Sequence, residues 1–317
     1  MGSEGIASPA IHKVLVLGNN RTTTSIFNAL AKDSVDVHLA VPRLSDALAG
    51  LNVQLHQCDL SRLSLGKLLG TLRPDLIVST SGGGSFDVQR DIIEAALGTG
   101  VRRFVPAEFG HDSHNQALQH RLPPLAERAR VIDYLRDLAD QGRIEWVGIA
   151  TGTPLDHGLQ SGNLGFDLKW QSATLHGKGT ERFAASSTGW IGRVVSQVVK
   201  QWDGVRNQYM YAAGLVTTAN DVLECLERRT GQQWTADRGD VEDCIREAEQ
   251  RVERGFPDAG MFLMERSVLY DEGLDAVGPF IGRDAKPVLG LGEEDVDDVV
   301  KSAVHAHKHL GKADCGC

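Results

Sequence analysis

The sequence predicts an α/β fold, a doubly wound parallel sheet followed by a smaller, mixed α/β region. Through the first half of the chain, short apolar runs alternate with segments whose apolar residues recur at helical spacing. The first and fourth apolar runs end in loops of glycine and hydroxyl-bearing residues. The 317 residues, 41% of them hydrophobic, can bury a sizeable core as one large or two modest domains.

The first half of the chain supplies the elements of this sheet. The continuous apolar run within residues 13–18 indicates a strand. Strands are predicted over residues 13–18, 35–41, 52–55, 75–79, 103–106 and 145–150, with helices over 24–31, 63–72 and 88–97. The ligand crevice of such a sheet lies at the carboxyl ends of its strands, so the loops after residues 17, 41, 79 and 105 should carry the chemistry.

The alternation stops after Gly152, where scattered glycines predict hairpins or loops. Helices return at residues 191–200, 219–228 and 241–252, and the acidic run at 293–298 should open the last helix rather than bind calcium. We therefore expect a first domain at residues 11–152 and a substrate-binding region at 153–310 that interleaves with the sheet. Residues 1–10 and 311–317 should form flexible tails.

Composition argues against several classes of partner. The formal net charge of −9 has the wrong sign for binding a nucleic-acid backbone. No apolar run is long enough for a membrane helix and the first ten residues are polar, so a cytoplasmic protein is expected. The five cysteines form neither a disulfide framework nor a zinc array, and no metal site is predicted. A metal or redox role for the terminal Cys315 and Cys317 is the less favoured alternative to a frayed tail.

The loop after the first strand reads GNNRTTTS over residues 18–25. A dinucleotide-binding loop of the form G-x-x-G-x-x-G would have glycine where this chain has Arg21 and Thr24. Hydroxyl groups and an arginine at a helix N-terminus could still bind a phosphate, and Arg43 ends the second strand where a 2′-phosphate would lie. The alternative is that residues 22–25 only cap the helix and Arg21 is solvated. The residues alone leave both interpretations open.

The loop after the fourth strand carries three glycines in a row, at residues 82–84. Its position at the crevice favours close approach of the backbone to a ligand, and the alternative is a flexible turn that binds nothing.

The segment GVRRFVPAEFG at residues 100–110 resembles the G-V-x-R-F-x-P-S-E-F-G signature of the NmrA-like, isoflavone-reductase-like branch of the atypical short-chain dehydrogenases. The order of other features, including the triple glycine, Gln89 and the TGQQW segment at residues 230–234, is similar to that family from about Lys13 to Val304. The resemblance implies a Rossmann-type NADP(H) domain with a smaller substrate domain. It also implies a reductase of phenolic or enone-like molecules, an enzyme of specialised metabolism, or a regulator that senses the nucleotide.

The two loops and this segment give the residues expected to bind the cofactor. They are Gly18, Asn20, Arg21, Thr22, Arg43, Ser81, Gly82, Gly83, Glu108 and Phe109.

The chain departs from the family's catalytic pattern. Reductases of the family carry a lysine in the helix after the signature segment, and the corresponding residue here is Arg128. A guanidinium stays protonated, so Arg128 could stabilise an oxyanion but could not shuttle a proton. The Tyr-x-x-x-Lys pair of ordinary short-chain dehydrogenases is also absent from the sequence.

Other acid–base candidates lie in the crevice loops. His111 and Asp112 follow the signature segment directly, and His157 lies beyond the sixth strand, next to Asp156. Imidazole and carboxylate groups can supply an acid and a base near neutral pH, and the alternative is a solvated polar loop. Asp156 could serve only to fix its loop.

Three functions fit these observations. The first is an NADPH-dependent oxidoreductase acting on a small aromatic or conjugated molecule in specialised metabolism. The second is a cofactor-independent cyclase, isomerase or dehydratase that reuses the crevice with histidine and aspartate chemistry. The third is a non-catalytic NADP(H)-sensing regulator. The sequence leaves the substrate and the oligomeric state open.

Overall fold

The computed structural model describes residues 10–43 and 54–309. Most of the expected tails, the terminal Cys315 and Cys317 and the start of the third predicted strand lie outside these residues.

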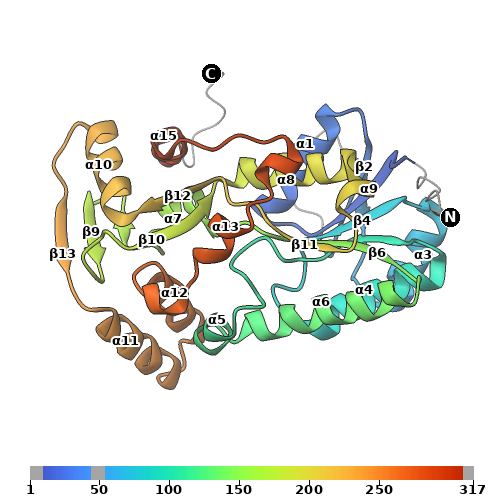
Figure 1. Ribbon diagram of the computed structural model, residues 1–317, viewed down its shortest axis with the longest axis horizontal. Helices are drawn as coiled ribbons and strands as arrows, with labels where there is room; N and C mark the ends of the chain where they lie inside the picture. The colour runs from blue at the N-terminus through green and yellow to red at the C-terminus, as the bar shows by residue number, and fades with distance from the viewer. Residues whose placement is uncertain (1–9, 44–53, 310–317) are drawn as a thin grey trace.

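A seven-stranded sheet forms the centre of the molecule, with its strands in the order β11-β6-β5-β4-β1-β2-β3 (Figure 1). All neighbouring strands pair in parallel. The strands are β1 (Lys13–Leu17), β2 (Asp36–Val41), β3 (Gln54–Gln57), β4 (Leu76–Ser79), β5 (Arg103–Val105), β6 (Glu145–Ala150) and β11 (Gln208–Tyr211). The chain order reverses between β1 and β4, so the ligand crevice of this doubly wound fold lies where these two strands end.

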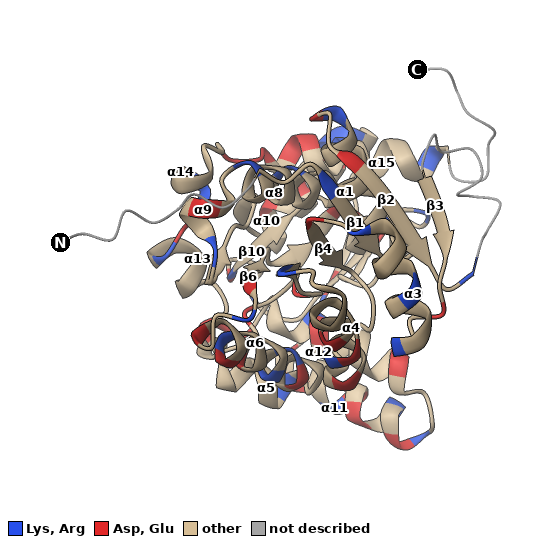
Figure 2. Cartoon of the chain, turned by 90° about the vertical axis from the view of Figure 1, so that its right-hand side faces the viewer, with Lys and Arg blue, Asp and Glu red and all other residues tan. Residues whose placement is uncertain are grey.

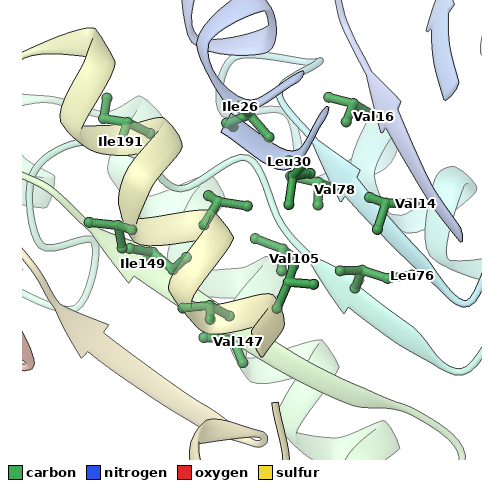
Figure 3. Packing of buried hydrophobic residues seen from close by; sticks show 14 of the residues in the cluster. Val14, Val16, Ile26, Leu30, Leu76, Val78, Val105, Val147, Ile149 and Ile191 are labelled. Atoms are coloured by element: carbon green, nitrogen blue, oxygen red, sulfur yellow. The ribbon is translucent and has the colours of Figure 1, made fainter. Parts of the chain in front are cut away.

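Helices cover both faces of the sheet (Figure 1). They are α1 (Arg21–Lys32), α3 (Arg62–Leu72), α4 (Phe86–Thr99), α6 (Pro124–Asp140), α8 (Thr188–Lys200) and α9 (Trp202–Val205). The short α5 (Gln116–Arg121) packs instead in a separate apolar cluster with Leu122, Leu125 and Val268. Successive side chains of a strand point to opposite faces. Val14 of β1 therefore packs with α1 and α8, whereas Leu15 packs with α3, α4 and α6. The apolar cluster between the sheet and helices α1 and α8 is called the first core here. Figure 3 shows it, with Ile26, Leu30 and Ile191 facing the valines of the sheet.

Most of the remaining elements form a second region at one end of the sheet (Figure 1). The helix at residues 286–289 is an exception, because Leu289 packs with α8 in the core of the large sheet. The strands of the second region form two three-stranded sheets, ordered β12-β10-β7 and β13-β9-β8. The remaining elements are β7 (Thr153–Pro154), α7 (Leu155–Ser161), β8 (Phe166–Asp167), β9 (Ser172–Leu175), β10 (Arg182–Ser186), β12 (Leu215–Thr218), α10 (Ala219–Thr230), β13 (Thr235–Arg238), α11 (Val241–Glu253), α12 (Pro257–Val268), η1 (Glu272–Leu274), α13 (Gly278–Gly282), α14 (Lys286–Leu289) and α15 (Val296–Lys308). After β7, β8, β9 and β10 of the second region, the chain returns to the large sheet through α8 and β11.

The predicted fold class is confirmed, and the differences concern element ends and missed helices. Helix α1 begins at Arg21 rather than at residue 24, because Asn20 is its N-cap and forms a capping box with Thr23. The predicted cap at residues 22–25 is thus placed too late. Helices α5, α6 and α12 were not predicted. The acidic run does open the last helix, where Asp295 accepts hydrogen bonds from the Asp297 and Asp298 amides.

Charge of both signs is spread over the outer helices. Figure 2 shows acidic and basic residues interspersed on α4, α6 and α11. No helix within residues 10–43 and 54–309 is long and apolar enough to cross a membrane. In the same part of the chain, no group of three or more histidine, cysteine or acidic side chains is arranged to hold a metal ion.

Candidate active site

The loops after β1 and β4 are packed tightly against each other. Gly18 has a φ of 138°, and a Cβ at this position would overlap the hydroxyl of Thr80. That hydroxyl lies 2.9 Å from the Leu17 carbonyl oxygen, to which it donates, and 2.6 Å from the Thr23 hydroxyl. Only glycine fits here, because the backbone is left-handed and the neighbouring hydroxyl network is buried.

The N-terminus of α1 lies at this crevice and has backbone amides without a hydrogen-bond acceptor. The Asn20 side chain accepts from the Thr23 amide, at 2.9 Å, and donates to the Thr80 carbonyl, at 3.1 Å. Helix geometry gives the amides of Arg21 and Thr22 no acceptor inside the helix, and no other acceptor for them is present among the described residues. Free amides at the positive end of a helix dipole form a site for an anion.

The two arginines predicted to bind the cofactor lie apart from each other. Arg21 donates a hydrogen bond to the side chain of Gln160 on α7, so it spans from α1 to the second region. Arg43 follows β2 and is exposed.

The triple-glycine loop has left-handed backbone and open space beside Gly83. Gly82, Gly83 and Gly84 all have positive φ, and nothing packs within 4 Å of a Cβ built on Gly83. The Gln89 side chain donates to the Ser79 hydroxyl and the Ser81 carbonyl. It also accepts from the Ala107 amide, and thus ties the loop after β4 to the loop after β5.

A small cleft of about 130 Å³ lies where these loops meet. It is lined by Asn20, Thr22, Thr80, Gly83, Ala107, Glu108, Phe109 and Arg128. Five of the residues predicted to bind cofactor are therefore brought together here. Gly18, Ser81 and Gly82 belong to the loops behind it, whereas Arg21 and Arg43 do not line it.

A second cavity, of about 280 Å³, lies between the loop after β5, α6, α7 and α12. It brings together His111, Arg128 and His157, three of the four predicted catalytic residues. The fourth, Asp112, does not line this cavity, and its side chain is buried. Its carboxylate accepts from the Tyr211 hydroxyl, at 3.1 Å, and from the His114 amide, at 2.9 Å. These hydrogen bonds tie the loop after β5 to β11, and a catalytic role for Asp112 stays a prediction.

Arg128 forms a wall shared by both cavities, together with Phe109. Its guanidinium donates to the Gly83 carbonyl, at 2.7 and 3.2 Å, and to the Glu108 carbonyl, at 3.1 Å. These hydrogen bonds fix a permanent positive charge between the cofactor-side cleft and the larger cavity.

The two histidines of the larger cavity are uncharged at neutral pH. Burial, with the nearby charge of Arg128, lowers the pKa of His111 to about 4. Burial also lowers the pKa of His157, and the charge of Arg21 acts in the same direction. A neutral imidazole can donate or accept a hydrogen bond, but neither ring stores a proton for acid catalysis at pH 7. Asp156 accepts from the amide and hydroxyl of Thr188 and so fixes the start of α8.

Glu108 is the carboxyl group in this site that can exchange a proton near pH 7. Its side chain is buried and accepts a hydrogen bond of 3.1 Å from the Tyr209 hydroxyl. Burial raises its pKa to about 7, although the charge of Arg128 opposes the shift. The sequence placed Glu108 next to the cofactor but gave no sign of this titration, because it depends on burial.

Sequence reasoning missed the contribution of α12. Met261, Phe262 and Glu265 of this helix line the larger cavity, as does Thr153 from β7. Pro257 at the first turn was the available signal, since proline is favoured at the start of a helix. No local pattern pointed to Tyr209, which reaches Glu108 from the edge strand β11.

Comparisons with known proteins find named oxidoreductases with similar sequences. No protein-family model matches the chain. The chain is 29% identical to Oxidoreductase aprR of Aspergillus flavus over 282 residues, which cover 89% of each protein. It is 29% identical to Oxidoreductase poxI of Penicillium oxalicum over 232 residues, 71% of this chain and 73% of the other. An NmrA-like family domain-containing oxidoreductase of Gibberella moniliformis is 24% identical over 239 residues, 69% and 77% of the two chains.

Solved structures show the same fold. An isoflavone reductase superposes with a TM-score of 0.70 at 17% identity, covering 92% of this chain and 99% of the other. A leucoanthocyanidin reductase from Vitis vinifera, solved as a complex with NADPH, gives 0.71 at 16% identity, with coverage of 92% and 99%. An NADPH-dependent quinone oxidoreductase from Escherichia coli gives 0.68 at 17% identity, with coverage of 92% and 98%.

Proposed function

We propose that this chain is a member of the NmrA-like and isoflavone-reductase-like family and an NADPH-dependent oxidoreductase of a small, conjugated, largely apolar molecule. Its curated relatives are named oxidoreductases, and solved structures with its fold include NADPH complexes. We further propose an aromatic or enone substrate and a place in specialised metabolism.

The residues at the crevice fit a nicotinamide dinucleotide. The free amides at the start of α1 suit a phosphate, and the open backbone above Gly83 leaves room for close approach. Asn20 and Thr22 would lie along the cofactor, and Arg43 would contact the 2′-phosphate. When bound, NADPH supplies a hydride to the substrate.

One observation carries the proposal: Arg128 and Phe109 line both the cofactor-side cleft and the larger cavity. A substrate in the larger cavity would thus meet the cofactor beside a fixed positive charge. When a carbonyl or conjugated carbonyl accepts a hydride at carbon, negative charge develops on its oxygen. Arg128 stabilises that charge, and the neutral His111 ring adds a hydrogen bond. The proton that completes the reduction comes from solvent, since a guanidinium does not release one.

Titration of the purified protein with NADPH, followed by nicotinamide fluorescence and calorimetry, tests the cofactor assignment. We expect micromolar affinity and a clear preference over NADH. Arg43→Ala should reduce that preference about 10-fold through loss of one charge-assisted contact to the 2′-phosphate. Arg136→Ala, at a surface ion pair of α6, is the matched control and should change neither affinity.

Three other outcomes would revise the proposal. Unchanged cofactor preference in Arg43→Ala would remove Arg43 from the site. If neither cofactor binds at millimolar concentration, a non-redox enzyme becomes the leading account. Tight binding without consumption of NADPH by any conjugated carbonyl compound would instead favour a nucleotide-sensing regulator.

A further inference from the structure

The larger cavity contains a carboxylate for which hydride transfer has no use. Glu265 of α12 lines it and is exposed to solvent in the absence of a ligand, although neighbouring side chains partly desolvate its carboxylate. Burial raises the pKa of Glu265, and the positive charge of Arg128 opposes that shift. Within the part of the chain that the structure describes, the carboxylate accepts no hydrogen bond and forms no ion pair. A carboxylate held at a cavity in this way is free to accept a hydrogen bond from a ligand.

Thr153 provides a second unpaired polar group in the same cavity. Its side chain is only 4% exposed, and its hydroxyl has no hydrogen-bond partner among the described residues. Buried hydroxyl groups normally find a partner, because burial without one costs about 1–3 kcal/mol. The hydroxyl oxygen itself has almost no accessible surface, so a bound molecule would reach it only after rotation of the Thr153 side chain.

The rest of the lining sets the character of the molecule that fits. Much of it is apolar, and its larger apolar side chains are Phe109, Leu122, Leu125, Leu164, Met261 and Phe262. The single positive charge of Arg128 is matched by the carboxylate of Glu265, and both histidines have a lowered pKa. A substrate with its own carboxylate or phosphate would place that anion in a small cavity with Glu265, which costs Coulomb energy. The cavity therefore favours a neutral molecule.

We propose that Glu265 determines substrate specificity by accepting a hydrogen bond from a hydroxyl group of a neutral, aromatic carbonyl substrate. The proposal rests on the function proposed above, since it assumes that the substrate carbonyl lies beside Arg128. A molecule that lacks the hydroxyl leaves Glu265 desolvated and unpaired, and sites of this kind reject such analogues strongly.

The test compares two probes that differ in one hydrogen-bond donor. They are 4-(4-hydroxyphenyl)but-3-en-2-one and its O-methyl ether, each titrated by calorimetry into the protein with and without saturating NADP⁺. In the unmodified protein the phenol should bind at least 10-fold more tightly than the ether. In Glu265→Leu this ratio should fall to about 2-fold or less, whereas Glu265→Gln, which keeps an acceptor oxygen, should retain part of it.

The controls separate this proposal from the proposed function. Asp258→Asn changes another carboxylate of α12 that does not line the cavity, and it should leave the ratio unchanged. Cofactor affinity should be the same in all variants, so a failure of NADPH to bind would contradict the proposed function without altering the ratio measured in the cofactor-free protein. Equal affinity for phenol and ether in the unmodified protein, no binding of either, or an undiminished ratio in Glu265→Leu would overturn the assignment of Glu265.

Discussion

At the scale of single residues, burial changes the acidity of Glu108, an effect that its neighbours in the sequence do not predict. Its carboxyl is buried beside the Tyr209 hydroxyl, and burial raises its pKa from 4.5 to about 7. Below pH 4.5 the carboxyl is protonated in both the folded and the unfolded chain. As the pH rises, the unfolded chain ionises first, so the folded state loses relative stability until the pH passes about 7.

Replacement of Glu108 by glutamine should remove this pH dependence. The shift from 4.5 to about 7 corresponds to a penalty of about 3 kcal/mol at pH 8, where the buried group must be charged. We expect Glu108→Gln to unfold at a higher denaturant concentration than the unmodified protein at pH 8, and to differ little from it at pH 4.5. Urea unfolding at the two pH values measures both differences.

Glu127→Gln provides the control for this measurement. Its carboxylate lies in an ion pair with Arg130, and a hydrogen bond from that guanidinium lowers its pKa. Neutralising Glu127 should therefore give no gain in stability at pH 8. A Glu108→Gln protein with the same pH profile as the unmodified chain would show that Glu108 is not held protonated by burial.

At the scale of elements, α1 begins three residues earlier than its apolar periodicity predicted. The polar first turn contains no apolar signal, and the start is set by the Asn20 cap and its bond to Thr80 across the crevice. Helix α12 was missed for a different reason. Its apolar residues pack in two separate clusters, so they do not form a single apolar stripe. Local sequence thus located α1 but not its first turn, which lines the cofactor-side cleft.

Loss of the Asn20 cap should affect both stability and cofactor binding. Asn20→Ala removes the bonds to Thr23 and Thr80 and should lower the free energy of unfolding by about 1–2 kcal/mol. NADPH affinity should fall as well, because the amides of the first turn lose their fixed orientation. Denaturant unfolding and fluorescence titration give the two values.

The cap of α10 offers a matched comparison at a helix that lines neither cavity. Thr218 forms the same kind of capping box, with Asp221. Thr218→Ala should lower stability by about 1 kcal/mol and leave NADPH affinity unchanged. Equal losses of affinity in both variants would mean that the α1 terminus has no special role in binding.

At the scale of the whole molecule, the contact between α1 and α8 joins the first half of the chain to the second. Gly192 of α8 lies against α1 so closely that a Cβ there would stand 2.5 Å from the Ser25 carbonyl oxygen. The Ser25 hydroxyl donates to the Thr188 carbonyl at 2.6 Å in the same contact. The first core lies beneath these two helices (Figure 3).

An added methyl group at this contact should destabilise the fold. Gly192→Ala forces the helices apart, and overpacking of this kind costs about 1–3 kcal/mol. The same substitution in α3, Gly66→Ala, meets no atom within 4 Å and should instead stabilise the protein by about 0.5–1 kcal/mol through helix propensity. Thermal unfolding of the two variants should therefore shift in opposite directions, and a parallel shift would contradict the tight packing of α1 on α8.

The sequence by itself determined the doubly wound sheet and the loops that line the small cleft at its crevice. These follow from local signals: strand and helix periods, glycines that permit left-handed backbone, and the segment at residues 100–110. Tertiary structure alone decided that Asp112 is buried and does not line the larger cavity, that Arg21 reaches Gln160 and that Glu265 joins Arg128. These contacts depend on how elements far apart in the chain pack, and the same packing buries Glu108 and raises its pKa.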